Sequence, residues 1–398
     1  MRHRVHSLEA LQAFMRLTED ERIGIRDTAG VFRWNITPHY ADLMDPDDPD
    51  CPIRRQMVPH ATELEEDIIG AMDPLDEVAH SPVKNLIHNY VDRVAFCVTS
   101  ECAIYCRYCL RKRMVGDADH MMRKSEIREG LTYLRQHPEI KDVLLTGGDP
   151  LTFSDAQIVW LLDELRQIPH VDIIRIGSRL PVTLPQRFTP PLLEVLASHQ
   201  PLWLNTHFNH AKELVPRVDE ALRAITKTGT AIGNQTVLLK GVNDTVEDLR
   251  ALFNGLVRRN VRPYYLYQAQ VIGGTQSFRT PIEQGMWLME QLQGSMTGFA
   301  IAKYVLDTPF GKVPLNRTYV LGRTPTHVIM RTTRDTLWAE PNPAPSIAAA
   351  WSTYLPRIAW PEATYTIAPI SGEIIQVDEM PLPVPMTQQA GEQVGITE

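Results

Sequence analysis

Three cysteines in one short stretch are the residues of this sequence best suited to chemistry. Cys102, Cys106 and Cys109 have the spacing Cys-x3-Cys-x2-Cys within residues 101–113, ECAIYCRYCLRKR. A structural zinc site normally has four nitrogen or sulfur ligands, usually in two separated pairs, and no second pair matches these three. Three thiolates instead suit a [4Fe–4S] cluster with one open iron, because every iron needs one ligand from outside the cluster.

An iron without a protein ligand can bind a small molecule. S-adenosylmethionine chelates such an iron through its amino and carboxylate groups, and one electron from the cluster then cleaves a carbon–sulfur bond to give a 5′-deoxyadenosyl radical. The alternatives are a zinc loop or three unrelated buried cysteines, since free cysteine is often buried. The spacing favours the cluster. Neither Cys51 nor Cys97 shows such a pattern, and we expect Cys97 in the core, inside an apolar strand.

The elements that must position this cluster form a repeating series from residue 94 onward. Strands are predicted at residues 94–100, 142–147, 171–177, 201–207, 231–239, 262–268 and 298–307. Amphipathic helices are predicted between them at residues 126–137, 156–168, 190–199, 218–229, 245–259 and 281–295. This alternation, with right-handed crossovers, predicts an α/β fold in which a parallel sheet closes into a partial (βα)6 TIM-like barrel.

The segments on either side of the predicted barrel differ from it in composition. Residues 1–90 are polar and mixed, and we expect an N-terminal helical extension with one helix at 7–19 and a loop at 42–52. Residues 91–310 would form the barrel itself. Residues 311–398 would form a small β-containing C-terminal extension, with short strands within 313–340 and a mobile tail at 381–398.

Polar motifs follow three of the predicted strands. The cysteine stretch follows the first strand, TGGDP (146–150) follows the second, and NTHFNH (205–210) comes at the end of the fourth. In barrels of this kind the chemistry lies on the loops at the C-terminal ends of the strands. We therefore expect these motifs to converge on one face.

The motifs together resemble one known family. The stretches HSPVKNLIHNYVDRVAF, CAIYCRYCLRKR, LLTGGDPL, IIRIGSRLPVTLPQRFTP, WLNTHFNH, GNQTVLLKGVND, RPYYLYQ and FRTP are similar to the lysine 2,3-aminomutase family of radical S-adenosylmethionine enzymes, over roughly residues 35–340. The resemblance implies an isomerase, an intramolecular aminotransferase that moves an α-amino group to the β-carbon of an amino acid. It also implies pyridoxal 5′-phosphate as a cofactor beside the [4Fe–4S] cluster and S-adenosylmethionine, with a radical formed at Cβ.

The resemblance assigns roles to individual residues. Cys102, Cys106 and Cys109 match the cluster ligands. The residues that match contacts to S-adenosylmethionine are Gly147, Gly148, Asp149, His207 and Gln235. Tyr90 and Arg93 match residues near the pyridoxal phosphate, and Arg111 matches the arginine that holds the substrate carboxylate, a role that suits its planar fork. Taken alone, the glycines could only make a turn, His207 could be a packed or capping histidine, and Arg111 could be a solvated charge.

One lysine matches the residue that holds pyridoxal phosphate as a Schiff base. In the family this lysine follows an Asp-Ala-Pro-Gly-rich segment, and here VLDTPFGKVPLN places Lys312 there. The glycine stretch is two residues shorter than in the family, and Phe310 replaces a glycine, so the loop must take a different path. The plain alternative for Lys312 is a surface lysine in a turn.

The sequence departs from the lysine enzyme where the substrate side chain is held. Two acidic residues hold the side-chain ammonium there; this chain keeps Asp307 but has Gln270 at the other position. One carboxylate and one amide suit a more diffuse cation with many donors, such as a guanidinium. We therefore expect a free basic L-amino acid as substrate, arginine ahead of lysine, and poor binding of glutamate. Asn89 also replaces an arginine that lies near the phosphate in the family.

Other functions remain open at this level. The alternatives are an aminomutase that acts on a lysine of a translation elongation factor, one that acts on another free amino acid, a radical enzyme without pyridoxal phosphate, and a non-catalytic iron–sulfur or zinc protein. A net charge of −8 argues against a general nucleic-acid binder. Without an apolar run of 18 residues we expect no membrane span and a cytoplasmic protein. The resemblance implies a reductant of the flavodoxin or ferredoxin type and a homo-oligomer.

Overall fold

The computed structural model describes residues 3–28, 30–65, 72–346, 348–358, 365–367 and 374–376. At its centre is a nine-stranded sheet whose strand order follows the chain, from β1 to β9. Neighbouring strands from β2 to β8 pair in parallel, while β1 and β9 pair antiparallel at the two ends. The strands are β1 (Leu86–Tyr90), β2 (Arg93–Thr99), β3 (Asp142–Gly147), β4 (Ile173–Gly177), β5 (Leu202–Thr206), β6 (Ala231–Leu238), β7 (Val261–Gln268), β8 (Lys303–Thr308) and β9 (Gly311–Pro314).

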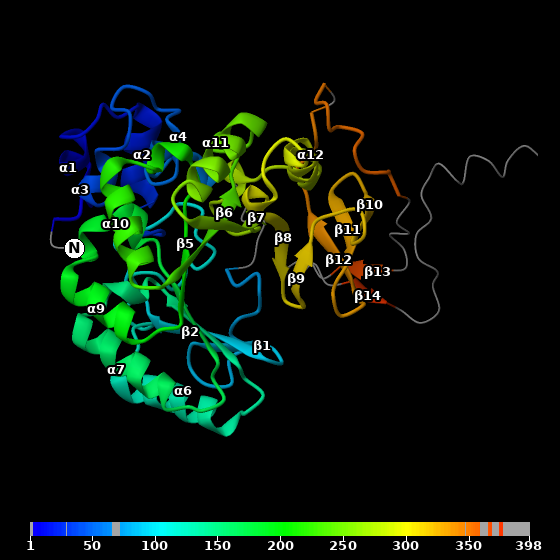
Figure 1. Cartoon of the computed structure of the whole chain (residues 1–398). Helices are drawn as coiled ribbons and strands as arrows, with labels where there is room; N and C mark the ends of the chain where they lie inside the picture. Colours follow the sequence, from blue (N-terminus) through cyan, green and yellow to red (C-terminus); the bar gives the residue numbers. More distant parts are fainter. Residues whose placement is uncertain are drawn as a thin grey trace, which may run out of the picture.

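Six long helices form the crossovers between consecutive parallel strands and lie on the outside of the curved sheet (Figure 1). They are α6 (Lys124–Gln136), α7 (Asp155–Arg166), α9 (Pro190–Ser198), α10 (Pro216–Lys227), α11 (Val246–Val257) and α12 (Ile282–Leu292). Short helical turns lie in the loops at α8 (Leu180–Thr183) and at residues 150–152, 185–187, 211–213, 276–278 and 298–300. The predicted α/β fold with a partial (βα)6 barrel is thereby confirmed.

The sequence forms these elements because its apolar residues recur with the right periods. In α10 the buried residues are Val218, Ala221, Leu222 and Ile225, which is the spacing of one helix face. In β6 buried and half-buried residues alternate, since successive side chains of a strand point to opposite sides. The half-buried set of β6 includes Gln235 and Val237, which face the interior of the barrel.

The N-terminal extension contains two helices where the sequence pattern predicted one at residues 7–19. That prediction is wrong because α1 (Leu8–Gln12) ends early and α2 (Glu19–Thr28) begins separately. Thr18 caps α2: its hydroxyl accepts a hydrogen bond from the N–H of Glu21 at 3.2 Å, and its own N–H donates to the Glu21 carboxylate at 2.7 Å. This capping box starts a new helix. Three short helices follow, α3 (Pro38–Ala41), α4 (Pro52–Arg55) and α5 (Thr62–Glu65).

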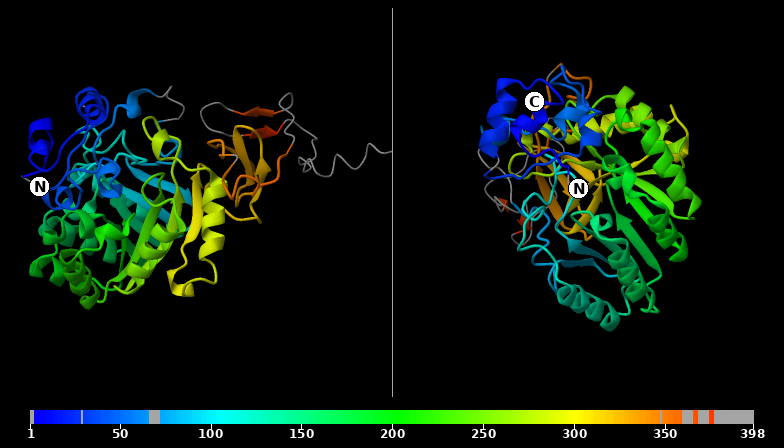
Figure 2. Two further views of the ribbon diagram at one scale, coloured as in Figure 1. Left: turned by 90° about the horizontal axis from the view of Figure 1, so that it is seen from above. Right: turned by 90° about the vertical axis from the view of Figure 1, so that its left-hand side faces the viewer.

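The C-terminal extension stands beside β8 and β9, as the view from above shows (Figure 2). Its strands β10 (Val320–Arg323), β11 (His327–Arg331) and β12 (Leu337–Pro341) form an antiparallel sheet, and β13 (Tyr365–Ile367) pairs with β14 (Ile374–Gln376). The predicted mobile tail at 381–398 lies outside the described residues.

Two predicted boundaries need comment. The strand predicted at 298–307 begins later, at Lys303, because the N–H of Ala300 bonds back to Thr297 in a helical turn instead of joining the ladder. The barrel sheet continues through β1 and β9, past the division proposed at residues 90 and 310. That division stays a prediction.

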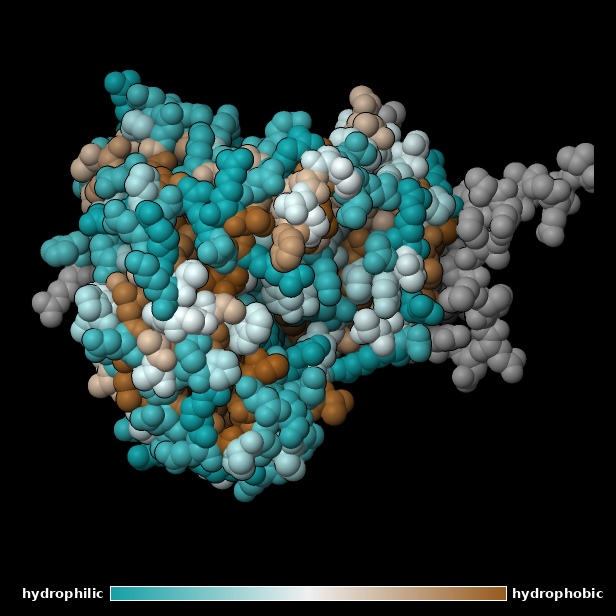
Figure 3. Space-filling model, in the orientation of Figure 1, coloured by the Kyte–Doolittle hydropathy of each residue, from teal (hydrophilic) through white to brown (hydrophobic). Residues whose placement is uncertain are grey.

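The outer surface carries both hydrophilic and hydrophobic side chains (Figure 3). Hydrophilic side chains cover most of the face seen in Figure 3, with hydrophobic ones showing between them. No helix among the described residues is long and apolar enough to span a membrane.

Candidate active site

A cavity of about 340 Å³ lies inside the barrel. Alternate residues of β3, namely Asp142, Leu144 and Thr146, face into it, as the two-residue period of a strand requires. The predicted site residues that line this cavity are Tyr90, Arg93, Arg111, His207, Gln235, Gln270, Asp307 and Lys312. The barrel therefore brings together residues that are up to 222 positions apart in the chain, such as Tyr90 and Lys312.

Asp307 and Lys312 face each other across a tight hairpin. They are cross-strand partners in β8 and β9, joined by the two-residue turn Pro309-Phe310. Gly311 follows the turn with φ +101, a left-handed conformation that suits glycine. The Thr308 hydroxyl also donates to the Gly311 carbonyl at 2.7 Å. Because the shortened loop closes in this way, Lys312 Nζ lies 2.8 Å from Asp307 Oδ1.

Lys312 is held as a cation in the free chain. Burial alone would lower its pKa, but the Asp307 carboxylate, followed by Tyr267 and Tyr90, outweighs burial and raises the pKa above its usual value. The rings of Tyr267, Tyr265 and Tyr90 lie 5.6, 5.9 and 6.0 Å from Nζ, close enough for cation–π attraction. This end of the cavity therefore attracts a cation.

Gln270 lies against the same aspartate. Its Nε2 donates a hydrogen bond to the backbone carbonyl of Asp307 at 3.0 Å. The amide oxygen has no partner among the described residues, so it is free to accept from a ligand. The carboxylate of Asp307 and the amide oxygen of Gln270 thus offer one charged and one neutral acceptor.

Arg111 reaches the cavity from the cysteine loop and is held there by Glu77. Its Nη2 lies 2.7 Å from Glu77 Oε1, and its Nε donates to both carboxylate oxygens, at 3.1 and 3.2 Å. Arg113 Nη2 adds a fourth contact to Glu77, at 3.0 Å. Burial would raise the pKa of Glu77, but Arg111 and Arg113 hold that pKa below its ordinary value. Glu77 therefore fixes the direction in which Arg111 presents its remaining N–H groups.

Tyr90 joins the lysine strand to the first strand of the sheet. Its hydroxyl accepts a hydrogen bond from the backbone N–H of Lys312 at 2.8 Å, and the guanidinium of Arg93 stacks 4.0 Å from its ring centroid. Next to it, Asn89 donates to the Pro309 carbonyl at 2.9 Å and its amide oxygen accepts from Arg334 at 2.6 Å. The cavity wall on this side carries positive charge.

The cysteine loop follows β2 directly. Cys102, Cys106 and Cys109 are all half-buried, whereas Cys97 within the strand is fully buried, as predicted. Burial, with the neighbouring Asp149, raises the pKa of Cys102, and burial together with Cys106 raises that of Cys109 to about 11. The thiols of Cys102 and Cys109 therefore stay protonated at neutral pH in the free chain, and binding of a cluster would displace these protons.

The three thiols of the loop can be compared with the ligand sets of a single metal ion and of an iron–sulfur cluster. Among the described residues no three Cys, His, Asp or Glu side chains gather around one point as ligands of one metal ion would. A cubane cluster spreads its protein ligands, because each thiolate binds a different iron. The three half-buried cysteines of this loop would supply three such ligands.

The two glycines after β3 permit a close approach to this loop. A side chain on Gly148 would meet the Glu101 carbonyl at 2.2 Å, and Gly147 has φ +121. The N–H groups of Gly148 and Asp149 donate to the carbonyls of Thr99 and Glu101, at 2.6 and 2.7 Å. Glycine is thus required by packing here. Contact with S-adenosylmethionine stays a prediction for these residues, which do not line the barrel cavity.

Asp149 has a structural task in the free chain. Its carboxylate accepts hydrogen bonds from the Ser178 hydroxyl at 3.0 Å and from the N–H of Arg179 at 2.8 Å. Burial raises the pKa of Asp149 to about 6, although these hydrogen bonds act to lower it. Asp149 therefore ties the loop after β3 to the loop after β4.

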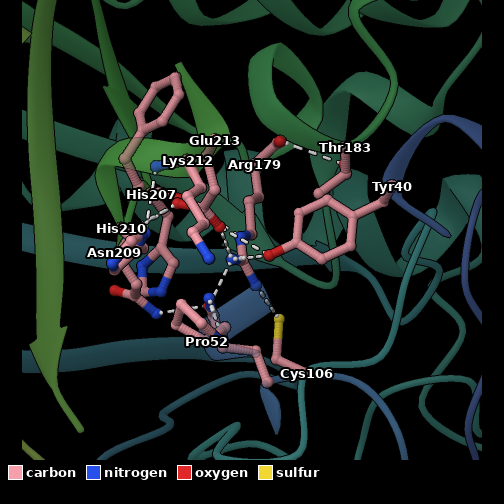
Figure 4. A network of polar contacts seen from close by, with 12 residues as sticks. Tyr40, Pro52, Cys106, Arg179, Thr183, His207, Asn209, His210, Lys212 and Glu213 are labelled. Carbon is pink, nitrogen blue, oxygen red and sulfur yellow. Dashed lines mark hydrogen bonds and ion pairs between the residues drawn. The ribbon is translucent and has the colours of Figure 1, made fainter. Parts of the chain in front are cut away.

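His207 and Gln235, both in the lining of the cavity, make contacts to tyrosines. His207 Nε2 lies 2.9 Å from the Tyr108 hydroxyl, and Gln235 donates to the Tyr267 hydroxyl at 3.3 Å. Burial, and then the charge of Arg179, lowers the pKa of His207 well below its usual value, so the ring is neutral at neutral pH. Figure 4 shows His207 beside Arg179 and Cys106.

Sequence reasoning missed several residues of this site. Glu77 gave no signal, because its partner Arg111 is 34 positions away. Arg179 was not singled out either, although it bonds to Cys106. Tyr265 and Tyr267 could have been found, since residues two apart in a strand share a face.

Comparison with known proteins identifies the family. A model of the Radical SAM superfamily matches residues 96–253, and a model named Lysine-2,3-aminomutase matches residues 289–371. L-lysine 2,3-aminomutase from Bacillus subtilis (strain 168) is 40% identical over 379 residues, which cover 95% of this chain and 80% of that enzyme. The chain belongs to the lysine 2,3-aminomutase family.

Members of the lysine 2,3-aminomutase family differ in the amino acid in their names. L-lysine 2,3-aminomutase from Clostridium subterminale is 42% identical over 333 residues, covering 83% of this chain and 80% of that enzyme. Glutamate 2,3-aminomutase from Clostridioides difficile (strain 630) is 38% identical over 332 residues, covering 83% and 78%. The family implies a [4Fe–4S] cluster and S-adenosylmethionine, and its lysine 2,3-aminomutases are pyridoxal-phosphate-dependent. These relatives therefore do not fix the amino acid on which this chain acts.

Proposed function

We propose that this chain is a pyridoxal-phosphate-dependent aminomutase that moves the α-amino group of a free basic L-amino acid, arginine ahead of lysine, to the β-carbon. The observation that supports it most is the cross-strand pair of Asp307 and Lys312 inside a cavity that also contains Arg111. The same cavity therefore contains the amine of Lys312, the carboxylate of Asp307 as an acceptor for a cationic side chain, and the N–H groups of Arg111 as donors to a carboxylate.

The cavity suits a phosphate-bearing aromatic aldehyde. Lys312 supplies the amine, and Tyr90, Tyr265 and Tyr267 supply flat apolar surface around it. Arg93 adds positive charge for a phosphate; its ion pair with Asp92, at 3.4 Å, is largely exposed and therefore weak. When bound, the cluster with S-adenosylmethionine supplies a carbon radical that can remove hydrogen from Cβ, and pyridoxal phosphate supplies a conjugated ring that spreads an unpaired electron.

The residues of this chain bind and orient the substrate. Arg111, directed by Glu77, offers its free N–H groups to the α-carboxylate. Lys312 is paired with Asp307 only while its amine is free. A Lys312 amine that held the cofactor would no longer neutralise Asp307, and a cationic substrate side chain could then pair with that carboxylate.

The acceptors around Asp307 favour a guanidinium. The Asp307 carboxylate can accept two N–H groups of a planar fork, and the free amide oxygen of Gln270 can accept another. A compact ammonium needs fewer acceptors, and a carboxylate side chain would meet Asp307 as a like charge. The order expected is therefore arginine, lysine, glutamate.

Turnover decides this proposal. The purified chain, reconstituted with iron, sulfide and pyridoxal phosphate, is incubated anaerobically with S-adenosylmethionine, a reductant of the flavodoxin or ferredoxin type or dithionite, and each amino acid. The expected result is a β-amino acid from arginine, less from lysine, and none from glutamate. Turnover of glutamate alone would contradict the proposal of a basic substrate. Turnover only of a lysine within a translation elongation factor would instead favour an aminomutase that acts on a protein.

A binding experiment with pyridoxal phosphate distinguishes the proposed enzyme from a radical enzyme that does not use this cofactor. The visible absorbance of the cofactor bound to Lys312 should disappear in Lys312→Ala, while the iron content stays unchanged. A Lys303→Ala variant serves as the control, because Lys303 is exposed at the start of β8 and does not line the cavity. A chain that forms 5′-deoxyadenosine but never binds pyridoxal phosphate would be a radical enzyme of another kind.

A further inference from the structure

We propose that Arg179 donates a hydrogen bond to the sulfur of Cys106 and thereby raises the reduction potential of the cluster. This inference rests on the proposed function, because it takes Cys106 as one of the cluster ligands. Arg179 acts through Cys106 and is therefore a positioning residue.

The contact is direct and buried. Arg179 Nη1 lies 2.8 Å from Cys106 Sγ, and the arginine is only 9% exposed. Among the described residues, Cys106 is the one of the three loop cysteines whose sulfur receives a hydrogen bond from a side chain. The donor comes from the loop after β4 and approaches the cysteine loop from another part of the barrel rim (Figure 4).

The rest of the guanidinium is fully engaged, which fixes the direction of Nη1. Nη2 contacts Glu213 Oε1 at 2.7 Å, Gln56 Oε1 at 2.8 Å and the Tyr40 hydroxyl at 3.1 Å. Nε donates to the His207 carbonyl at 3.1 Å. These partners leave Nη1 as the one nitrogen of the fork that points at sulfur.

Glu213, which holds the guanidinium of Arg179, is itself fixed by further hydrogen bonds. Glu213 is fully buried, and it also accepts from the Tyr40 hydroxyl at 2.6 Å and from the backbone N–H of Asn209 at 2.7 Å. At the other end, the backbone N–H of Arg179 is held by Asp149. A donor fixed at both ends keeps its hydrogen bond in either oxidation state of the cluster.

The direction of the effect follows from charge. A cluster that gains one electron becomes more negative, and an N–H donor to a ligand sulfur stabilises the more negative form more strongly. Glu213 compensates the charge of the guanidinium at longer range, so the local hydrogen bond is the main contribution. Loss of the donor should make the cluster harder to reduce.

Redox titration of the reconstituted cluster, followed by electron paramagnetic resonance, tests this inference without any turnover. The Arg179→Met variant should have a more negative midpoint potential than the wild type, and Arg179→Lys should lie between them. Arg323→Met is a matched control: Arg323 is 8% exposed and pairs with the buried Glu283 at 2.8 Å, but it lies in β10. Its potential should equal that of the wild type. Equal potentials for Arg179→Met and the wild type would overturn the inference.

A second measurement covers the case in which the Arg179 variants do not fold or hold the cluster. Wild-type protein is labelled with ¹⁵N in the arginine guanidinium groups only, and its reduced cluster is studied by pulsed electron paramagnetic resonance. A ¹⁵N coupling is expected across the hydrogen bond, and its absence contradicts the inference. A wild-type chain that takes up no cluster contradicts the proposed function instead.

Discussion

Lys312 Nζ and Asp307 Oδ1 lie 2.8 Å apart because the two residues are cross-strand partners in a hairpin with a two-residue turn. The pair places the amine expected to bind pyridoxal phosphate beside the carboxylate expected to bind the substrate side chain. One short hairpin therefore links the cofactor site with the choice of substrate.

The first prediction concerns Asp307→Asn. Without the carboxylate, burial dominates and the pKa of Lys312 falls, so more of its amine is neutral and reactive at neutral pH. Attachment of pyridoxal phosphate should become faster, by about tenfold for each unit by which the pKa falls, and its pH profile should move to lower pH. The rate of attachment is measured as the rate of change of visible absorbance at pH values from about 6 to 10.

The same variant should bind basic substrates poorly. Asp50→Asn is its control, since Asp50 pairs with Arg55 at an exposed position and does not line the cavity. A pH profile of Asp307→Asn that coincides with the wild type would show that the ion pair does not govern the amine.

A second prediction concerns Gln270→Asp. This change places two carboxylates around the substrate cation, an arrangement that compensates a compact ammonium well. The ratio of kcat/KM for lysine to that for arginine should rise, by about tenfold if the change contributes about 1.4 kcal/mol. Gln270→Asn, which keeps an amide, should leave the preference for arginine in place. A higher preference for arginine in Gln270→Asp would contradict the role given to this position.

A third prediction concerns Glu77→Gln. Glu77 is 4% exposed and binds Arg111 and Arg113, so loss of its charge should destabilise the fold by about 1–3 kcal/mol and raise KM for the amino acid. Because the pKa of Glu77 is lowered in the fold, its contribution is complete above its unfolded value and is lost as pH falls through the lower folded value. Urea unfolding at pH 7 and at acid pH should therefore show a smaller difference between variant and wild type at acid pH.

Glu290→Gln is the control for that comparison, because Glu290 pairs with Arg317 at an exposed position. Its unfolding midpoint should match the wild type at neutral pH. If Glu77→Gln bound the substrate as the wild type does, Arg111 would not depend on Glu77 for its direction.

A fourth prediction tests the turn itself. Gly311→Ala adds a side chain at φ +101 that meets Tyr90 at 3.2 Å, so both backbone strain and the contact oppose it. Strain alone costs about 1–2 kcal/mol. Gly294→Ala is the matched control, since Gly294 has φ +77 but nothing within 4 Å of the added atom. Affinity for pyridoxal phosphate should fall in Gly311→Ala and stay unchanged in Gly294→Ala. An equal affinity in both variants would separate the turn from the cofactor site.

The barrel could be predicted from the sequence because its elements carry local patterns. The helix spacing of α10 and the alternation of β6 are visible in the sequence, and strand order follows chain order. The division between α1 and α2 was missed although Thr18 and Glu21 carry a capping signal.

Pairs between distant residues could not be predicted in the same way. The contacts of Glu77 with Arg111 and of Arg179 with Cys106 depend on how loops fold across the rim, and neither position follows a local period. The partnership of Asp307 with Lys312 depends on the two-residue turn. The family resemblance named both residues, but their ion pair required the hairpin.

The central claim is that Lys312 binds pyridoxal phosphate in the cavity opposite Asp307. The most direct measurement is borohydride reduction of the protein with pyridoxal phosphate, followed by proteolysis and mass spectrometry of the modified peptide. A single pyridoxyl phosphate group is expected on Lys312, and the Lys312→Ala variant should carry none. A group attached to another lysine, or no attachment in a protein that still converts its amino acid, would contradict it.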